Sequence, residues 1–291
     1  MPELPEVETI VRDLNKKVLN RAFVDVWTDW KKMIKRPKDF QKFKKEIKGR
    51  KIEEIGRRGK NILIWLSGER VLLIHQKMTG HLLLGNWQKE NKGWQSKNSG
   101  PLKDPMNRFL HLIFWLDNGK QLALSDLRKF AKVELWRKKE LADSKELKAL
   151  GPEPLEKSFT FQKLQEVLKK KKGKIKQILM DQTVISGIGN IYSDEILFTA
   201  KIHPLREVPK LTKPELRRIY RATKEILKKA IELRGESISD FRDLQEKKGY
   251  FDKIRKVYRR ENEKCPKCGA KIKRIKLAGR SAHFCPKCQQ L

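Results

Sequence analysis

The chain has 291 residues, of which 69 are lysine or arginine and 36 are aspartate or glutamate, so its formal net charge is +33. This excess of positive charge predicts a polyanionic partner, with nucleic acid as the leading candidate and ribosome association as an alternative. A thermophile's charged surface is a further alternative, but it would carry more lysine and more glutamate together. The sequence has no leader pattern and no run of about 18 apolar residues, so no membrane span is expected and we expect a cytoplasmic protein. The length suits about two domains, and we expect a monomer.

The first half of the chain has the pattern of one helix followed by many short strands. Residues 3–19 repeat apolar side chains with helical spacing, which predicts an amphipathic helix. Polar residues 86–106, rich in glycine and proline, predict a flexible loop. Strands are predicted at eight apolar or alternating segments: 22–27, 51–55, 61–66, 70–75, 81–85, 109–116, 121–127 and 132–136. Strands of this number and spacing indicate a β-sandwich or barrel.

The second half changes to helical periodicity. Thr212 and Glu215 form a capping box at the start of a helix that Gly235 ends, and a mixed polar segment at 236–250 predicts a mobile loop. We therefore expect an α+β multidomain protein. Its expected parts are an N-terminal domain at 1–137, a linker at 138–150, a helical domain at 151–258 that carries the 236–250 loop, and a terminal segment at 259–291.

The terminal segment contains all four cysteines as two Cys-x2-Cys pairs separated by 16 residues: Cys265 and Cys268, then Cys285 and Cys288. Four thiolates offered from two tight turns close a tetrahedral Zn²⁺ site with no open position, so we expect one structural zinc, with disulfides as the alternative. The intervening residues alternate and turn at Ala278-Gly279-Arg280. This pattern predicts a β-hairpin with Arg280 near its tip, either as a solvated charge or as a phosphate contact.

Two further stretches suggest chemistry. In Gly187-Ile188-Gly189-Asn190 the glycines allow close backbone approach, and Asn190 would begin a helix as its N-cap and seat a phosphate. A plain turn between helices is the alternative. At the N-terminus, removal of Met1 would expose the amine of Pro2, which is neutral more often than a lysine and adds to a sugar aldehyde carbon. Glu3 could deliver a proton there, although a simple helix start explains the same residues.

Taken together, these segments resemble the bacterial formamidopyrimidine-DNA glycosylases. The family fold implied by this resemblance is a β-sandwich flanked by helices, then a helix–two-turn–helix domain and a zinc β-hairpin. The implied activity is excision of oxidised purines (8-oxoguanine and formamidopyrimidines) from duplex DNA, followed by strand cleavage, in base excision repair at the nucleoid. The matching stretches are MPELPEVET (1–9), RRGKNILI (57–64), IHQKMTGHL (74–82), SDLRKF (125–130), LGPEPL (150–155), DQTVISGIGNIYSDEILF (181–198), GYFDKIRKVY (249–258) and the cysteine segment (265–288).

The resemblance also implies roles for residues at matching positions. Pro2 would attack C1′ of the damaged nucleotide to form a Schiff base, and Glu3 would donate a proton near the sugar ring oxygen. Lys60 would assist β-elimination, and Arg280 would bind phosphate and assist δ-elimination. Five others would contact DNA: Met78, Arg128 and Phe130 by filling the space left by the flipped base, and Lys171 and Asn190 at the backbone.

The chain departs from the family pattern at three places. Lys77 replaces the glycine of H-L-G-M, and Arg259 replaces the glycine of V-Y-G-R, which adds a cation near the zinc hairpin. Only the second histidine of K-H-x-H is kept, as His111, and the contact of the first moves to Arg108, so both residues are expected to contact DNA.

Two alternatives stay open. An endonuclease VIII-type glycosylase for oxidised pyrimidines shares the chemistry, but Leu4 and the SDLRKF stretch favour the purine branch. A zinc-hairpin protein that binds DNA without catalysis fits the charge and the cysteines equally well, and it has no need of Pro2, Glu3 or Lys60.

Overall fold

The computed structural model describes residues 2–91, 93–237 and 241–291, and these form two compact units. The first unit comprises residues 1–148 and 234–250, and the second comprises 149–233 and 251–291. This division differs from the expected boundaries in two places, because residues 138–148 and the segment 234–250 both group with the first unit. Among the described residues, no helix is long and apolar enough to cross a membrane.

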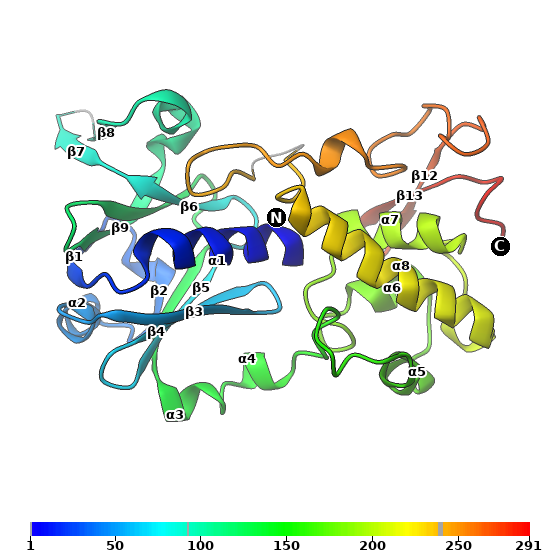
Figure 1. Cartoon of the computed structure of the whole chain (residues 1–291), viewed down its shortest axis with the longest axis horizontal. Helices are drawn as coiled ribbons and strands as arrows, with labels where there is room; N and C mark the ends of the chain where they lie inside the picture. The colour runs from blue at the N-terminus through cyan, green and yellow to red at the C-terminus, as the bar shows by residue number, and fades with distance from the viewer. Residues whose placement is uncertain (1, 92, 238–240) are drawn as a thin grey trace. The chain divides into compact units, whose positions relative to one another are not determined.

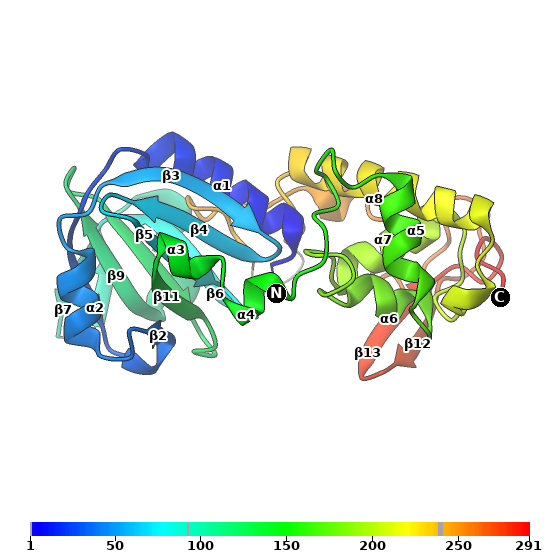
Figure 2. The ribbon, with the colours of Figure 1, turned by 90° about the horizontal axis from the view of Figure 1, so that it is seen from below.

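The first unit is a sandwich of two sheets, one of the two architectures that the strand pattern indicates and the one that the resemblance implies (Figure 2). One sheet has the order β1-β9-β10-β6 and the other the order β2-β11-β5-β4-β3, with only β2 and β11 pairing in parallel. Its elements are α1 (Leu4–Val18), β1 (Phe23–Thr28), β2 (Ile34–Arg36), α2 (Phe40–Ile47), β3 (Ile52–Arg58), β4 (Asn61–Leu66), β5 (Arg70–His75), β6 (Gly80–Gly85), β7 (Trp87–Glu90), β8 (Gly93–Ser96), β9 (Leu110–Leu116), β10 (Gln121–Asp126), β11 (Lys132–Arg137), α3 (Lys138–Leu141) and α4 (Lys145–Lys148).

The core of this unit lies between the sheets and beneath α1, which packs along β3 and β4 (Figure 2). The apolar face of α1, from Val7 to Val18, is buried there. All eight predicted strands are present. The predicted loop at 86–106 is wrong in part, because β7 and β8 form a hairpin that places Trp94 edge-on against Trp27, with ring centroids 5.1 Å apart.

Residues 238–240 of the predicted 236–250 loop lie outside the described residues, and the described residues of the segment 234–250 are anchored to the sandwich (Figure 1, orange). The backbone N–H of Leu84 in β6 donates to the carbonyl of Leu244, whose side chain joins the core. Arg234 donates to Asp13 of α1 at 2.5 Å and to Asp243 at 2.6 Å. The guanidinium thus ties the start of the segment to its middle and to the first helix.

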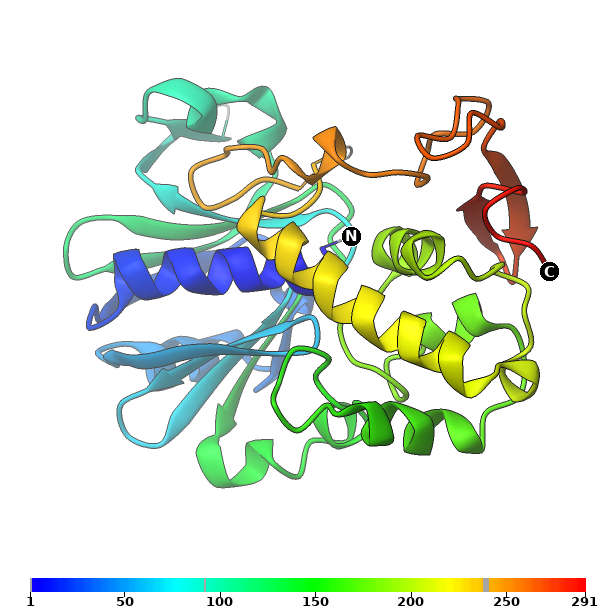
Figure 3. The same cartoon turned by 45° about the vertical axis from the view of Figure 1, so that its right-hand side comes forward.

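The second unit is helical and ends in a small hairpin (Figure 3). The predicted capping box is confirmed at α8, where Thr212 and Glu215 each accept the other's backbone N–H. The elements are α5 (Phe161–Lys169), α6 (Ile175–Met180), α7 (Asn190–Ala200), the 3-10 turn η4 (Val208–Lys210), α8 (Lys213–Glu232), and the paired strands β12 (Lys273–Leu277) and β13 (Arg280–Phe284). α7 packs against α6, α8 and β13, so its buried face organises the unit.

Candidate active site and nucleic-acid interface

The residues that begin α1 are buried and held by one carboxylate. Pro2 and Glu3 precede the helix, and Glu3 is 2% exposed. Glu6 accepts the backbone N–H of Glu3 at 2.7 Å through Oε2 and that of Glu236 at 2.8 Å through Oε1. Gly235 leaves room for this carboxylate, since a Cβ there would lie 2.6 Å from Glu6 Oε1. One carboxylate of the first unit therefore holds both the residue that follows Pro2 and the segment at Glu236.

Lys60 lies in the tight turn between β3 and β4, beside α1. Gly59 adopts φ +57°, which suits glycine, and Lys60 is only 7% exposed. Arg57 connects this hairpin to the helix by donating to Glu8 at 3.2 Å and to the Gly59 carbonyl at 2.9 Å. The turn that carries Lys60 is thus braced against the helix that follows Pro2.

A neutral histidine lies in the same neighbourhood. Burial, together with the positive charges of Lys77 and Lys60, lowers the pKa of His75 to about 3. The Nδ1 atom of His75 accepts the backbone N–H of Lys77 at 3.0 Å. Lys77 itself has φ +56°, so the residue that replaces a glycine keeps a glycine-like backbone conformation.

The three predicted gap-filling residues lie on two turns that one carboxylate holds together. Asp126 is fully buried and accepts the Thr79 hydroxyl at 2.5 Å and the backbone N–H of Ala131 at 2.7 Å. Met78 precedes Thr79 on the β5–β6 turn, while Phe130 precedes Ala131 on the β10–β11 turn. Both apolar side chains are exposed, at 39% and 51%, which excludes a role in the core.

Arg128 belongs to the same cluster. Its guanidinium carbon lies 4.6 Å from the centre of the Phe130 ring, and its backbone N–H donates to the Thr79 hydroxyl at 3.2 Å. Leu127, which the sequence did not single out, is 58% exposed next to it. The cluster combines apolar side chains and a cation on a rigid base, as a probe of stacked bases requires.

The two residues expected to replace the K-H-x-H contacts lie in different environments. Arg108 is exposed and stands 4.9 Å over the Phe109 ring, beside a hollow of about 310 Å³ lined in part by Trp87 and Trp94. His111 is 6% exposed, and its Nδ1 lies 2.8 Å from Asp29 Oδ1. Burial of the imidazole makes Arg108 the better placed of the two for DNA, and either contact stays a prediction.

The glycine turn of the second unit is built as a rigid entrance to α7. Gln182 accepts the Gly187 N–H at 2.8 Å and donates to the Ile188 carbonyl at 2.7 Å, so one side chain fixes both sides of the turn. The predicted N-cap is wrong by one residue, because Gly189 is the cap and Asn190 is the first residue of the helix. The Asn190 Oδ1 atom is buried and has no hydrogen-bond partner among the described residues.

Asn190 and Arg280 line one polar cavity of about 600 Å³ within the second unit. The hairpin turns at Ala278 and Gly279, as predicted, and Arg280 is the exposed first residue of β13. A cavity with several arginines at a helix N-terminus is suited to phosphate. The full lining is Asn190, Tyr258, Arg259, Glu261, Arg274, Gly279, Arg280, Ser281 and His283.

Two neighbouring acids of α7 hold the walls of this cavity. Asp194 accepts from Lys176 Nζ at 2.5 Å and from the backbone N–H of His283 at 3.0 Å, which fixes β13 against the helix. Glu195 accepts the backbone N–H groups of residues 256–258 at 2.8 to 2.9 Å. Burial raises the pKa of Glu195, although these three donors act in the opposite direction.

Lys171 follows α5 and is half-buried. Its Nζ lies 3.9 Å from Asp181 Oδ2, a distance at which the carboxylate exerts little hold in a partly exposed setting. The ammonium is therefore available to a phosphate, as the resemblance implies.

The four cysteines have the geometry of a metal site. Their Sγ atoms all lie within 4.8 Å of one another, and two of the separations are 3.4 and 3.9 Å. Zn–S bonds of about 2.3 Å in a tetrahedron place the sulfurs about 3.8 Å apart, whereas a disulfide needs about 2.05 Å. Cys265, Cys268, Cys285 and Cys288 thus hold one structural zinc, which fixes the base of the hairpin.

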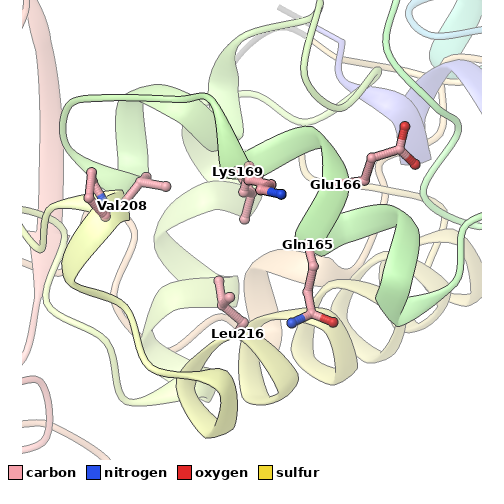
Figure 4. Close-up of a pocket in the computed structure, with 7 residues that line it drawn as sticks. Gln165, Glu166, Lys169, Val208 and Leu216 are labelled. Atoms are coloured by element: carbon pink, nitrogen blue, oxygen red, sulfur yellow. The ribbon is translucent and has the colours of Figure 1, made fainter.

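A separate hollow of about 420 Å³ lies between α5, η4 and the start of α8 (Figure 4). Leu216 and Val208 contribute apolar side chains to its lining, and Gln165, Glu166 and Lys169 of α5 contribute polar ones. None of the described residues that line it is a predicted site residue, so we assign it no part in the chemistry.

Known families match all three parts of the chain. A formamidopyrimidine-DNA glycosylase N-terminal domain matches residues 1–133, and the H2TH domain of the same enzymes matches 150–242. A zinc finger found in FPG and IleRS matches 262–291. The chain thus contains the domains of a zinc-containing DNA glycosylase.

Individual relatives agree over the full length. A formamidopyrimidine-DNA glycosylase of Pelotomaculum thermopropionicum is 40% identical over 291 residues, which is 100% of both chains. A crystal structure of a Lactococcus lactis FPG mutant with Fapy-dG DNA has a TM-score of 0.87 at 36% identity and full coverage of both chains. The Lactococcus lactis enzyme with abasic-site DNA has a TM-score of 0.86 at 35% identity, covering 99% of this chain and 100% of that one. The chain belongs to the formamidopyrimidine-DNA glycosylase family.

Proposed function

We propose that this chain is a bifunctional DNA glycosylase and AP lyase that excises oxidised purines, chiefly 8-oxoguanine and formamidopyrimidines, from duplex DNA. The observation that carries the proposal is the pair of turns on which Met78 and Phe130 are exposed while Asp126 holds the turns together. An enzyme that acts on a base within a duplex must extrude it and fill the gap in the stack. The Fapy-dG and abasic DNA bound by the solved relatives agree with this substrate class.

The chemistry begins at the amine of Pro2 after Met1 is removed. The amine attacks C1′, the bond from C1′ to the base breaks, and the base leaves with a proton. Glu3 donates a proton to the ring oxygen as the sugar opens, which leaves an iminium ion between Pro2 and C1′. The iminium withdraws electrons from C2′, so a proton is lost there and the 3′ phosphate departs by β-elimination. A second elimination releases the 5′ phosphate, and the gap has phosphates at both ends.

Other residues position the strand for these steps. Lys60 assists β-elimination from its braced turn. Arg280, with Asn190, binds a backbone phosphate and assists the second elimination, and Lys171 and Arg108 add backbone contacts that carry no sequence information. Arg128 faces the cytosine left without a partner. The zinc supplies no chemistry, because four thiolates leave it no open position, and instead it holds the hairpin that presents Arg280.

Borohydride trapping tests this proposal. We expect a covalent protein–DNA adduct, stable to denaturation, on a duplex with 8-oxoguanine opposite cytosine. Pro2→Gly, which replaces the secondary amine by a primary one, should reduce it strongly, whereas Pro5→Ala, which changes the other early proline, should keep it. A stronger adduct on a thymine-glycol duplex would favour the oxidised-pyrimidine alternative. No adduct on either duplex would refute both glycosylase functions and leave a DNA-binding protein.

DNA binding also sets the expected location. A net charge of +33 favours polyanions without regard to sequence, so we propose that the protein associates with the nucleoid. Fluorescence microscopy of a C-terminally tagged protein should show it over the nucleoid, and a uniform distribution would contradict this.

A further inference from the structure

Arg259 is the feature of the phosphate cavity that the family pattern does not explain. It lines the cavity with Asn190 and Arg280, and its side chain is exposed. Its backbone has φ +50°, a conformation that glycine adopts freely and that L residues rarely adopt. A long cation has therefore been placed at a position whose backbone favours glycine.

The structure fixes where this side chain begins. Glu195 accepts the backbone N–H groups of residues 256–258, so the chain immediately before Arg259 is anchored to α7. The guanidinium carbon of Arg259 lies 5.8 Å from the centre of the Tyr258 ring. The Arg259 side chain thus starts from an anchored backbone and lines the cavity beside Tyr258.

Charge balance within the cavity leaves Arg259 uncompensated. Among the described residues that line it, Glu261 is the only acid, and it lies 3.6 Å from Arg274 Nη1 and 3.6 Å from His283 Nε2. Arg274 also donates to the Ser281 hydroxyl at 2.9 Å. Across the described part of the chain, no carboxylate forms an ion pair with Arg259 or Arg280. Two arginines therefore face a cavity of about 600 Å³, which is larger than one phosphate group.

We propose that Arg259 binds an additional phosphodiester of the DNA strand, next to the phosphate assigned to Arg280 and Asn190. This inference deepens the proposed function, because it rests on DNA as the ligand of this cavity. Arg259 is a binding residue and takes no part in bond breaking. Loss of its guanidinium should weaken DNA binding on any sequence without slowing the chemical step.

The test compares two cationic residues of the second unit whose backbones both lie in the left-handed region. Arg259→Gly removes the cation and leaves a residue that suits the backbone. Lys201→Gly is the matched control, because Lys201 is exposed, has φ +57°, and ends α7 about 16 Å of helix away from Asn190. Binding is measured over a range of salt concentrations, on an undamaged duplex and on one with a tetrahydrofuran abasic analogue, which cannot form a Schiff base.

We expect Arg259→Gly to bind both duplexes about tenfold more weakly and to lower the slope of log K against log salt by about 0.9. Lys201→Gly should match the unchanged protein, and both variants should melt within about 3 °C of it.

An affinity and salt slope for Arg259→Gly equal to those of Lys201→Gly would overturn the proposal. If Arg259→Gly has a much lower melting temperature, Arg259→Gln is tested in its place. Binding by Arg259→Gln that equals that of the unchanged protein would also overturn the proposal. Because the analogue duplex measures binding alone, these outcomes are independent of borohydride trapping. Failure of the glycosylase proposal is therefore distinguishable from failure of the phosphate contact.

Discussion

The carboxylate of Asp126 offers the sharpest test of how the two gap-filling turns are held. It is fully buried and accepts the Thr79 hydroxyl at 2.5 Å and the Ala131 N–H at 2.7 Å, with the Arg128 N–H further away at 3.3 Å. Asp126→Asn keeps the shape of the side chain but replaces one acceptor oxygen by an NH₂ group. In one orientation of the amide its NH₂ group faces the Ala131 N–H, and in the other the Thr79 hydroxyl loses its acceptor, so one buried donor loses its partner either way.

The expected cost follows from these contacts. A hydrogen bond to a charged group contributes about 1.5 to 3 kcal/mol, and an unsatisfied buried donor costs about 1 to 3 kcal/mol. We therefore expect Asp126→Asn to lower the free energy of unfolding by about 2 to 4 kcal/mol. This is a large share of the roughly 5 to 15 kcal/mol that stabilises a typical domain.

Urea unfolding followed by tryptophan fluorescence measures this change selectively. All seven tryptophans lie between Trp27 and Trp136, in the first unit, so the signal reports the unit that contains Asp126. Asp117→Asn is the control, because this exposed acid has a weak 3.9 Å pair with Arg21 and should change stability by less than about 0.5 kcal/mol. Equal stabilities of the two variants would refute the reasoning.

Three further predictions concern a pH dependence, a buried amide and the metal. The pKa of His75 is lowered to about 3 from 6.5, so its contribution to stability is complete above pH 6.5 and falls as the pH drops. The free energy of unfolding should fall by about 2 kcal/mol by pH 5. Urea titrations at pH 7 and pH 5 should show this loss in the unchanged protein and not in His75→Asn. Gln76 is 2% exposed, and neither atom of its side-chain amide has a hydrogen-bond partner among the described residues. Gln76→Leu should therefore raise the free energy of unfolding by about 1 to 3 kcal/mol in urea titrations. A decrease would mean that the amide is hydrogen-bonded in solution. Cys285→Ala should weaken DNA binding about tenfold or more by misplacing Arg280, and so should chelation once metal analysis has verified zinc loss. The midpoint of unfolding followed by tryptophan fluorescence should stay the same, because all tryptophans lie in the first unit. Unchanged DNA binding would contradict the role of the metal.

Local periodicity predicted much of the fold because the relevant signals lie within a few residues of one another. The helix after Pro2, the eight strands and the capping box at Thr212 are all of this kind. By contrast, β2 and α2 were missed, since their few apolar residues are dispersed among lysines. Phe43 and Ile47 are nevertheless fully buried, and only the sandwich reveals what they pack against.

In the candidate site, too, the residues that could be predicted are those with a local signal in the sequence. Residues at family positions could be named from the sequence, and so could the cysteines, because their spacing suffices. The supporting acids could not, because their partners are distant in sequence: Asp126 lies 47 residues from Thr79, and Asp194 lies 89 from His283. Both acids stand within stretches that match the family, in SDLRKF and in SDEILF, and that was the only signal available for them.

The central claim is that the Pro2 amine forms the covalent bond to DNA, and locating that bond tests it most directly. The protein is reacted with an 8-oxoguanine duplex, reduced with borohydride, digested with nuclease and protease, and analysed by tandem mass spectrometry. The account predicts a sugar-derived mass on the N-terminal peptide, attached to Pro2 of a chain that lacks Met1. The same mass on Lys60 or another lysine, with Met1 retained, would contradict it.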